Sequence, residues 1–507
     1  MIGTLPRFHG LLRGLDAVGS SPQFEGRFGR LFRTLPPARF TEDDLKALAA
    51  RLVAEREDPP TGEDEDDAEE NSGISAGYTY LGQFIDHDLT FDPASSLQKQ
   101  NDPDSLVDFR TPRFDLDCVY GRGPDDQPYL YADDGLRMLL GRALTGNPHD
   151  PNTRDLPRNS PASGPRRALV GDPRNDENVI VSQLQGIFLR FHNRVANFLS
   201  GTDAIFEDVQ RFVRWHYQWV VLHDFLPTII GEETLGKILP HLKKKNGSIR
   251  QDKPDLRFFN PKNEQFMPVE FSVAAYRFGH SMVRPEYRLN TTLPGRFDIF
   301  SLDPNVSNLT GFREFPAEWA IDWSLFFDFG NHPPETGPGR LQLAYKIDTS
   351  LVNPLGSLPA SIGGKMPSLA LRNLLRGLRM GLPSGQDVAR KMEIEPIKDE
   401  DLKVGPATEE DAEENPRLID LSPRFKGNAP LWYYILAEAQ QQFDGHDKTP
   451  IHLGPVGGRI VGEVFVGLLL YDRHSYLNQD PTWEPFQDFF KDGKFGITEL
   501  IGQAMKA

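Results

Sequence analysis

A chain of 507 residues, 38% of them hydrophobic and 10% aromatic, can bury one large core or divide into two or three domains. The formal net charge of −17 argues against a nucleic acid as partner, because phosphate backbones require clustered lysine and arginine. The chain has one cysteine, Cys118, so no intramolecular disulfide can form and folding does not require an oxidising compartment.

The first 75 residues are predicted to form an extension ahead of a main domain at residues 76–507. Within the extension, Thr41 is a plausible N-cap for a short helix, with Asp44 at the third helical position. Residues 56–72 are acidic and poor in apolar side chains, which indicates a mobile surface loop. We find no signal-peptide core and no run of 18 apolar residues. We therefore expect no transmembrane segment, and either a cytoplasmic location or export without a classical signal peptide.

The segment at residues 77–90 concentrates polar chemistry between apolar residues. If the segment is helical, Gln83 and His87 stand four positions apart and share one face. Asp86 borders that face, whereas Asp88 points elsewhere, at a place where the helix could give way to a loop. One short element thus offers an imidazole for acid–base chemistry on one side and a carboxylate oxygen that can bind a hard metal ion on the other.

The turn-rich stretch at residues 101–135 carries oxygen-bearing side chains at even spacings. Thr111, Asp115 and Asp117 recur along one loop there. Calcium takes about six to eight hard oxygen ligands, and backbone carbonyls fill the remaining positions. The spacing is compatible with a calcium loop, and an ordinary polar turn gives the same pattern.

Arg174 and Glu177 stand three positions apart, just before a long apolar helix predicted over residues 179–199. Taken alone, they could form an ordinary first turn in which acidic side chains complement the helix dipole. Further helices are predicted over residues 209–226, ended by Pro227, and over residues 272–282, 368–376, 431–443 and 456–471. Strand patterns are scarce, so the predicted class is mostly α, with long loops and little β-structure.

Two of these later helices carry isolated functional groups. His280 ends the string Tyr-Arg-Phe-Gly-His at residues 276–280, where a single histidine is more often a satisfied core residue than a ligand. Asn373 and Arg376 lie one turn apart in the string Asn-Leu-Leu-Arg-Gly-Leu-Arg-Met-Gly-Leu-Pro at residues 373–383. Without further context, the second string could be a basic helix face in solvent.

Taken together and in their order along the chain, these motifs resemble the signature of the animal-type heme peroxidases, which belong to the peroxidase–cyclooxygenase superfamily of myeloperoxidase and lactoperoxidase. Gln-x-x-Asp-His-Asp at residues 83–88 and Arg-x-x-Glu at residues 174–177 are similar to its distal motifs. The strings around His280 and Asn373 are similar to its proximal motifs, and residues 454–462 give a weaker match. The resemblance implies one large helical domain around a buried heme, and the lack of disulfides resembles bacterial members.

The resemblance also implies a reaction. Hydrogen peroxide would be reduced to water through a ferryl intermediate of heme b, and small donors such as phenols, amines, halides or thiocyanate would be oxidised. His87 would move the proton, Arg174 would stabilise charge on the departing oxygen, and Gln83 would order water or a halide beside the iron.

The heme-binding residues follow from the same resemblance. His280 would ligate the iron, Asn373 would bond its far nitrogen, and Arg277 and Arg376 would meet the propionates. The chain departs from the family at Leu378, where many relatives carry arginine and this chain has Arg379 one position later. Asp86 and Glu177 occupy the positions that form heme esters in mammalian relatives. One calcium ion would be held by Asp88, Thr111, the Arg113 carbonyl, Asp115 and Asp117, the last replacing a serine.

Three other functions stay open. Fatty-acid dioxygenases of this fold use a tyrosyl radical three residues before the proximal histidine, where this chain has Arg277. Tyr276 is one position off, which on a helix turns it about 100° away. A calcium-stabilised binding protein without heme would have no use for both distal and proximal motifs. A helical zinc enzyme could use Trp215-His216 with His223-Asp224, although packing is the simpler reading of those pairs.

Overall fold

The computed structural model describes residues 26–54, 67–91, 107–243, 249, 251–261, 265–303, 305–331, 333–334, 336–411, 413–445 and 450–507. The predicted mostly α class is confirmed, and the strands are few and short among these residues. Residues 1–25 and the acidic stretch at residues 55–66 lie outside the described residues, so the predicted mobile loop is not tested there.

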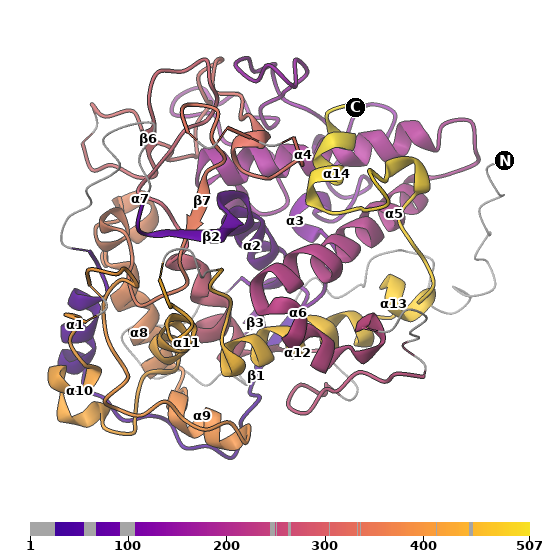
Figure 1. Cartoon of the computed structure of the whole chain (residues 1–507). Coiled ribbons are helices and arrows are strands. Elements are labelled where there is room, and N and C mark those ends of the chain that lie inside the picture. The colour runs from indigo at the N-terminus through magenta and orange to yellow at the C-terminus, as the bar shows by residue number, and fades with distance from the viewer. Residues whose placement is uncertain are drawn as a thin grey trace.

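The elements follow one another along the chain as Figure 1 shows. The α-helices are α1 (Glu42–Arg51), α2 (Ala76–Leu89), α3 (Asp117–Tyr120), α4 (Val179–Phe198), α5 (Phe206–Val220), α6 (Leu226–Ile238), α7 (Ala360–Gly363), α8 (Leu369–Arg379), α9 (Gly385–Lys391), α10 (Leu418–Leu421), α11 (Leu431–Gln440), α12 (Pro455–Tyr471), α13 (Tyr476–Gln479) and α14 (Ile497–Ala504). The strands are β1 (Gly26–Gly29), β2 (Glu70–Ser75), β3 (Val107–Asp108), β4 (Met267–Pro268), β5 (Glu286–Tyr287), β6 (Phe297–Asp298) and β7 (Leu343–Tyr345). They form three small sheets, in the orders β3-β1-β4, β2-β7 and β5-β6.

Helix α2 lies at the centre of the molecule and carries the Gln83–His87 face (Figure 1). It packs against α4, and the ring of Phe84 stacks on that of Phe188 with centroids 4.3 Å apart and planes within 5°. Other neighbours of α2 are the 3-10 segment η8 (Ala275–His280) and the π-helical segment η5 (Val221–Phe225). The apolar side of α2 is thus fixed in the core, which orients its polar side chains.

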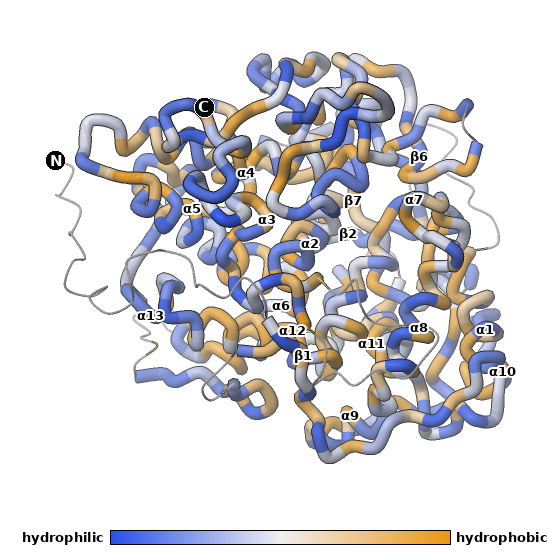
Figure 2. The backbone as a smooth tube through the Cα atoms, turned by 180° about the vertical axis from the view of Figure 1, so that it is seen from behind, coloured by the Kyte–Doolittle hydropathy of each residue, from blue (hydrophilic) through white to orange (hydrophobic). Residues whose placement is uncertain are grey.

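Helix α12 is the buried core helix that the sequence predicts, and it packs against α6. Figure 2 shows its hydrophobic character in the interior of the fold. The two helices approach closely at Gly462, where a Cβ atom would lie 2.4 Å from Cδ1 of Ile238. The two charged side chains of α12 form an ion pair, in which Nε of Arg459 donates to Oε1 of Glu463 at 2.5 Å. Among the described residues, no helix combines the length and apolar character that crossing a membrane requires.

The segment predicted to be an N-terminal extension contributes to the core. Thr41 caps α1 and Asp44 reciprocates with its side chain, as predicted. Leu45 and Leu48 of α1 are fully buried and belong to the same apolar cluster as α2 and α12. The domain boundary at residue 75 stays a prediction.

The prediction that Pro227 ends a helix was wrong. Helix α5 passes through the π-helical segment η5 and continues as α6, with Pro227 in its first turn. Pro227 has no N–H to donate to the preceding turn, and the π segment just before it accommodates that break in the hydrogen-bond pattern. The wider π turn lets the axis continue to Gly231, where a positive φ of 76° introduces the real kink.

Residues 67–72 were also predicted to be part of a mobile loop, and that prediction was wrong. Glu70 begins β2, which pairs antiparallel with β7, and its side chain is buried. Its Oε1 accepts a hydrogen bond from Nη1 of Arg284 at 2.5 Å, and Arg340 also pairs with it. The acidic composition misled the prediction, because the compensating arginines lie more than 200 positions away.

Replacing Glu70 with glutamine is expected to lower the free energy of unfolding by about 3–5 kcal/mol, because it leaves the charge of buried Arg284 without its main partner. The midpoint and slope of urea unfolding measure this loss. Asp43→Asn is the control, since Asp43 pairs with Lys46 in solvent and little change is expected. Equal effects of the two variants would contradict the assignment.

Candidate functional site

A cavity of about 370 Å³ lies beside α2, and both sets of predicted residues line it. One set comes from α2 and from the 3-10 turn η4 (Pro173–Asp176) with its C-cap, just before α4: Gln83, Asp86, His87, Arg174 and Glu177. The other comes from η8 and α8: Arg277, His280, Asn373 and Arg376. The fold therefore gathers residues that are nearly 300 positions apart around one space.

His87 is buried and neutral in this cavity wall. Its Nδ1 lies 2.6 Å from Oδ1 of Asn175, and its Nε2 lies 4.0 Å from Oε1 of Glu177. Burial, together with the nearby charge of Arg174, lowers the pKa of His87 to about 4. The ring can therefore accept a proton at neutral pH.

The amide of Gln83 is held at both ends. Its Nε2 donates to Oε1 of Glu177, and its Oε1 accepts from Nδ2 of Asn178 at 3.2 Å. Asn178 also caps α4 by accepting the N–H groups of Ile180 and Val181. The start of α4 thus fixes Gln83 and Glu177 together at the cavity wall.

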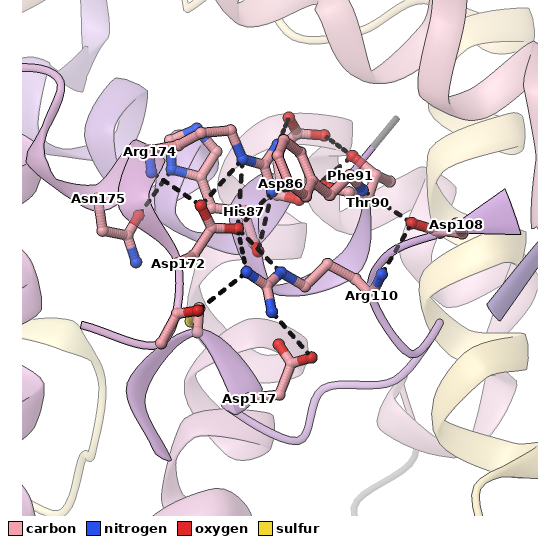
Figure 3. A network of polar contacts seen from close by, with 12 residues as sticks. Asp86, His87, Thr90, Phe91, Asp108, Arg110, Asp117, Asp172, Arg174 and Asn175 are labelled. Atoms are coloured by element: carbon pink, nitrogen blue, oxygen red, sulfur yellow. Dashed lines mark hydrogen bonds and ion pairs between the residues drawn. The ribbon is translucent and has the colours of Figure 1, made fainter. Parts of the chain in front are cut away.

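Arg174 is clamped by Asp172 and by two backbone carbonyls (Figure 3). Its Nη2 donates to Oδ2 of Asp172 at 2.8 Å, and its Nε and backbone N–H donate to Oδ1 of the same carboxylate. The same Nη2 also donates to the carbonyls of His87 and Thr90, at 3.2 and 2.5 Å. Nη1 lies 4.0 Å from Oδ2 of Asp86, on the cavity side. The positive charge is therefore fixed beside the His87 ring.

His280 faces the cavity from η8 and has a buried amide as partner. Its Nδ1 lies 2.7 Å from the Asn373 side-chain amide. Burial, and then the charges of Arg277 and Arg372, lowers the pKa of His280 to about 3. The neutral ring is the form of histidine that binds a metal.

Arginines are concentrated on the same side of the cavity. Arg277, Arg372 and Arg376 all contribute to its wall, although Arg372 was not predicted. Arg277 is anchored through Nε to the carbonyl of Ser272 at 3.0 Å. Arg379, the arginine displaced by one position, instead pairs with Glu42 of α1. The wall suits a ligand that carries carboxylates.

The predicted cation loop brings three carboxylates together below α2. One oxygen from each of Asp88, Asp115 and Asp117 lies within 4.8 Å of the others. Both oxygens of Asp88 and Oδ1 of Asp117 are buried without a hydrogen-bond partner among the described residues. Burial and the neighbouring Asp115 raise the pKa of Asp88, and burial raises the pKa of Asp117 to about 8. Such a cluster is stable in its ionised form only with a cation present.

The other two predicted ligands belong to the same loop. Thr111 donates its hydroxyl to Oδ2 of Asp115 at 2.7 Å, and its carbonyl accepts the N–H of Arg113 at 2.7 Å. The side chain of Arg113 points to Gln265, so only its backbone carbonyl is available to the loop. The chemistry of the set is that of a hard divalent cation such as calcium.

Arg110 joins this loop to the clamp of Arg174 (Figure 3). Its Nη1 donates to Oδ2 of Asp117 at 3.3 Å, and its Nε donates to Oδ2 of Asp172 at 2.9 Å. Its Nη2 donates to the carbonyl of Gly171 at 3.1 Å. Arg110 therefore offsets the negative charge that Asp117 introduces.

The prediction that Tyr276 turns away from the site was wrong. Residues 272–282 do not form one α-helix, because a π turn (Glu270–Ala274) passes into the 3-10 segment η8. Tyr276 consequently lines the cavity and donates its hydroxyl to the carbonyl of Gly82 at 3.2 Å. Arg277 still occupies the position three residues before His280.

The histidines of α5 and η5 are packing residues rather than metal ligands. Nδ1 of His216 lies 2.6 Å from the carbonyl of Phe212, and its Nε2 accepts the N–H of Phe486. His223 stacks on Trp219 with ring centroids 3.8 Å apart. Within the described part of the chain, only the aspartate loop groups three potential metal-binding side chains.

Comparison with known proteins agrees with this geometry. Residues 96–307 match the animal haem peroxidase family model. Chorion peroxidase of Aedes aegypti is 25% identical over 405 residues, which cover 78% of this chain and 45% of that protein. The structure of peroxidase A from Dictyostelium discoideum aligns over 91% of this chain and 92% of its own, with a TM-score of 0.57 and 17% identity.

These similarities support an assignment to the peroxidase–cyclooxygenase superfamily. Thyroid peroxidase of Sus scrofa is 29% identical over 312 residues, covering 57% of this chain and 30% of that protein. The chain thus spans less than half the length of these curated relatives. A fatty acid alpha-dioxygenase from Arabidopsis thaliana shares the fold, with a TM-score of 0.53, 14% identity, and coverage of 96% of this chain and 76% of its own.

Several residues of the site were not predicted from the sequence. Asn175 contacts His87, and Arg372 lines the cavity. Asp172 holds Arg174 in place, and Arg110 donates to Asp172. Asp172 and Asn175 are close in sequence to Arg174, and this proximity was the available signal. Arg110 and Arg372 lie in loop and helix positions where an arginine is usually solvated.

Glu177 gives the protein a specific pH dependence of stability. Burial raises its pKa from 4.5 to about 7, so the folded chain binds its proton more tightly than the unfolded chain does. The contribution of Glu177 to the free energy of unfolding is therefore fully present at low pH, and it is lost as the pH rises from about 4.5 to about 7. In heme-free protein, the free energy of unfolding of Glu177→Gln should increase relative to that of wild type as the pH rises through this window. Above the window, the difference between the two proteins should stay constant.

Urea unfolding at several pH values measures this difference. The control is exposed Glu207→Gln, for which the difference from wild type should not change with pH. A flat difference for Glu177→Gln would show that burial does not raise the pKa of this carboxyl in the folded protein.

Proposed function

We propose that this chain is a heme peroxidase, which reduces hydrogen peroxide to water with electrons from small donors such as phenols, amines, halides or thiocyanate. The observation that carries the proposal is a single cavity lined by His87 with Arg174 and by His280 with Asn373. The first pair supplies a neutral base beside a fixed positive charge. The second supplies a neutral imidazole with a buried partner.

The residues of the cavity wall fit a heme. The amide nitrogen of Asn373 lies 2.7 Å from Nδ1 of His280; with this amide turned so that its oxygen accepts a proton from Nδ1, Nε2 is the ring nitrogen left to ligate iron. The wall arginines can pair with propionates, and apolar side chains line the remainder: Val273, Phe278, Met282, Ile299, Leu369 and Met380. Heme bound there supplies an iron centre with an open coordination position and the electrons that cleave the oxygen–oxygen bond.

The chain's own residues would move the proton and stabilise the charge. His87 would accept a proton from hydrogen peroxide and return it to the oxygen that leaves as water, a role worth about 10²–10⁴-fold. Arg174 cannot lose its proton, and its fixed guanidinium would stabilise negative charge on that oxygen. Gln83, held by Glu177 and Asn178, would orient water or a halide nearby.

Two finer features belong to the proposal. A calcium ion would be held by Asp88, Thr111, the carbonyl of Arg113, Asp115 and Asp117, and would neutralise their orphaned oxygens. Asp86 and Glu177, which both line the cavity, are the candidates for ester links to the heme. Complete release of heme into acidified acetone after peroxide treatment would reject the links.

The test of the function is an absorption spectrum of heme-supplied protein before and after one equivalent of hydrogen peroxide. We expect a Soret band that shifts promptly and recovers when a phenol is added. Folded, heme-supplied protein without a Soret band would overturn the proposal. A Soret band that does not respond to peroxide would leave heme binding but remove the peroxidase assignment.

A further inference from the structure

We propose that Asn175 and Gln185 fix the tautomer of His87, so that Nδ1 carries the proton and Nε2 is the nitrogen that accepts one from peroxide. The inference rests on the proposed function, because it assigns the atom of the proposed base that reacts. Asn175 and Gln185 do not line the cavity, so both are positioning residues.

A chain of buried hydrogen bonds leads from α3 to His87. The carbonyl of Cys118 accepts from Nε2 of Gln185 at 3.3 Å, and Oε1 of Gln185 accepts from Nδ2 of Asn175 at 2.8 Å. Oδ1 of Asn175 then lies 2.6 Å from Nδ1 of His87 (Figure 3). Asn175 and Gln185 are both 0% exposed, so solvent does not compete for these bonds.

The Cys118 carbonyl, at one end of this series of hydrogen bonds, sets the direction of every bond in the series. A carbonyl can only accept, so Gln185 must turn its amide nitrogen toward Cys118 and its oxygen toward Asn175. Asn175 therefore donates its nitrogen to that oxygen and presents its own oxygen to His87. An oxygen in that position requires a proton on Nδ1, and a neutral imidazole then carries its lone pair on Nε2.

The opposite tautomer would place two acceptors against each other. Unprotonated Nδ1 would face Oδ1 of Asn175, and turning the Asn175 amide would set its oxygen against that of Gln185. Turning both amides would set the Gln185 oxygen against the Cys118 carbonyl. Every arrangement with the proton on Nε2 leaves a buried pair of acceptors unsatisfied, which disfavours it.

The tautomer matters because Nε2 is the nitrogen on the cavity side. It lies 4.0 Å from Oε1 of Glu177, another residue of the cavity wall, whereas Nδ1 faces the protein. A ring with its proton on Nε2 could donate to peroxide but could not accept from it. The two amides thus prepare the base before substrate arrives, with no rearrangement needed at the moment of proton transfer.

Three variants of heme-loaded protein test the role. Asn175→Ala removes the acceptor, and Asn193→Ala is the matched control. Asn175→Asp keeps an accepting oxygen toward His87 and, with its buried carboxyl protonated, still donates to Gln185. Asn193, in the second half of α4, is another buried amide. Its hydrogen-bond partner is the backbone of Met138. The readouts are the rates at which the ferric protein binds cyanide from hydrogen cyanide and reacts with hydrogen peroxide, because both need a base to take a proton.

We expect Asn175→Ala to slow both rates by about 10–100-fold, the usual cost of removing a partner that orients a functional histidine. Asn175→Asp should recover most of the loss, and Asn193→Ala should leave both rates unchanged. Equal losses in Asn175→Ala and Asn193→Ala, or failure of Asn175→Asp to recover the rates, would overturn the inference.

A second measurement does not depend on how the variants fold. In wild-type full-length protein with selectively ¹⁵N-labelled histidine, reduced and bound to carbon monoxide to make the heme diamagnetic, nitrogen chemical shifts report which ring nitrogen is protonated. The His87 signals are those absent from His87→Gln. A proton on Nε2 would overturn the inference. Wild-type protein that binds no heme would fail the proposed function instead, and the same labelling of the heme-free chain would still read the tautomer.

Discussion

Replacing His87 with leucine should lower the rate constant for the reaction with hydrogen peroxide by about 10²–10⁴-fold. Leucine removes the base while keeping the apolar volume of a residue that is 4% exposed, so the cavity should persist. Heme content should be unchanged, since the proximal pair of His280 and Asn373 is intact. Stopped-flow recording of the Soret band after mixing with peroxide measures the rate.

The control for this prediction is His149→Leu. The His149 side chain is 66% exposed and lies outside the cavity wall, so its loss should not alter the rate. If His87→Leu reacts as fast as wild type with full heme content, another group must take the proton. Arg174 is excluded from that role because a guanidinium stays protonated.

Calcium removal should lower the free energy of unfolding. Without a cation, Asp88 and Asp117 keep buried oxygens that have no hydrogen-bond partner in the described part of the protein. An uncompensated buried charge costs about 3–5 kcal/mol, and proton uptake by these carboxyls offsets part of that cost. Urea unfolding with excess calcium and with excess chelator measures the difference.

Asp117→Ser sharpens this test, because its effects on affinity and on stability should have opposite signs. The substitution removes one ligand charge, so calcium affinity should fall. It also removes one of three mutually repelling carboxylates, so the calcium-free protein should become more stable. Asp126→Ser, in an exposed ion pair with Arg122, is the control and should change neither quantity. A calcium-free Asp117→Ser protein less stable than wild type would show that the bond from Arg110 outweighs the repulsion.

The parts of the site that sequence could predict are those whose chemistry is local. Gln83, Asp86 and His87 share one helix, and helical spacing alone places their side chains together. The long helix α4 and its polar start were equally visible, because Asn178 caps an uninterrupted apolar stripe. The pairing of His87 with His280 around one cavity came only from resemblance to a family.

The parts that sequence could not predict depend on tertiary contacts. Residues 272–282 were predicted to form one helix, yet the chain changes there from a π turn to a 3-10 segment, which brings Tyr276 to the cavity. The π segment before Pro227 keeps a helix running where a proline usually stops it. Glu70 looked solvated because nothing nearby in sequence indicates Arg284.

The carboxylate of Asp172 accepts hydrogen bonds from Arg110 on one side and Arg174 on the other, so it belongs to two sites at once. We expect such sharing to link the two sites thermodynamically. If calcium in the loop tightens the hold on an anion beside Arg174, the anion must tighten the hold on calcium by the same factor. Titrating a small anion such as fluoride or cyanide with and without calcium would therefore measure the coupling free energy between the cavity and the calcium loop.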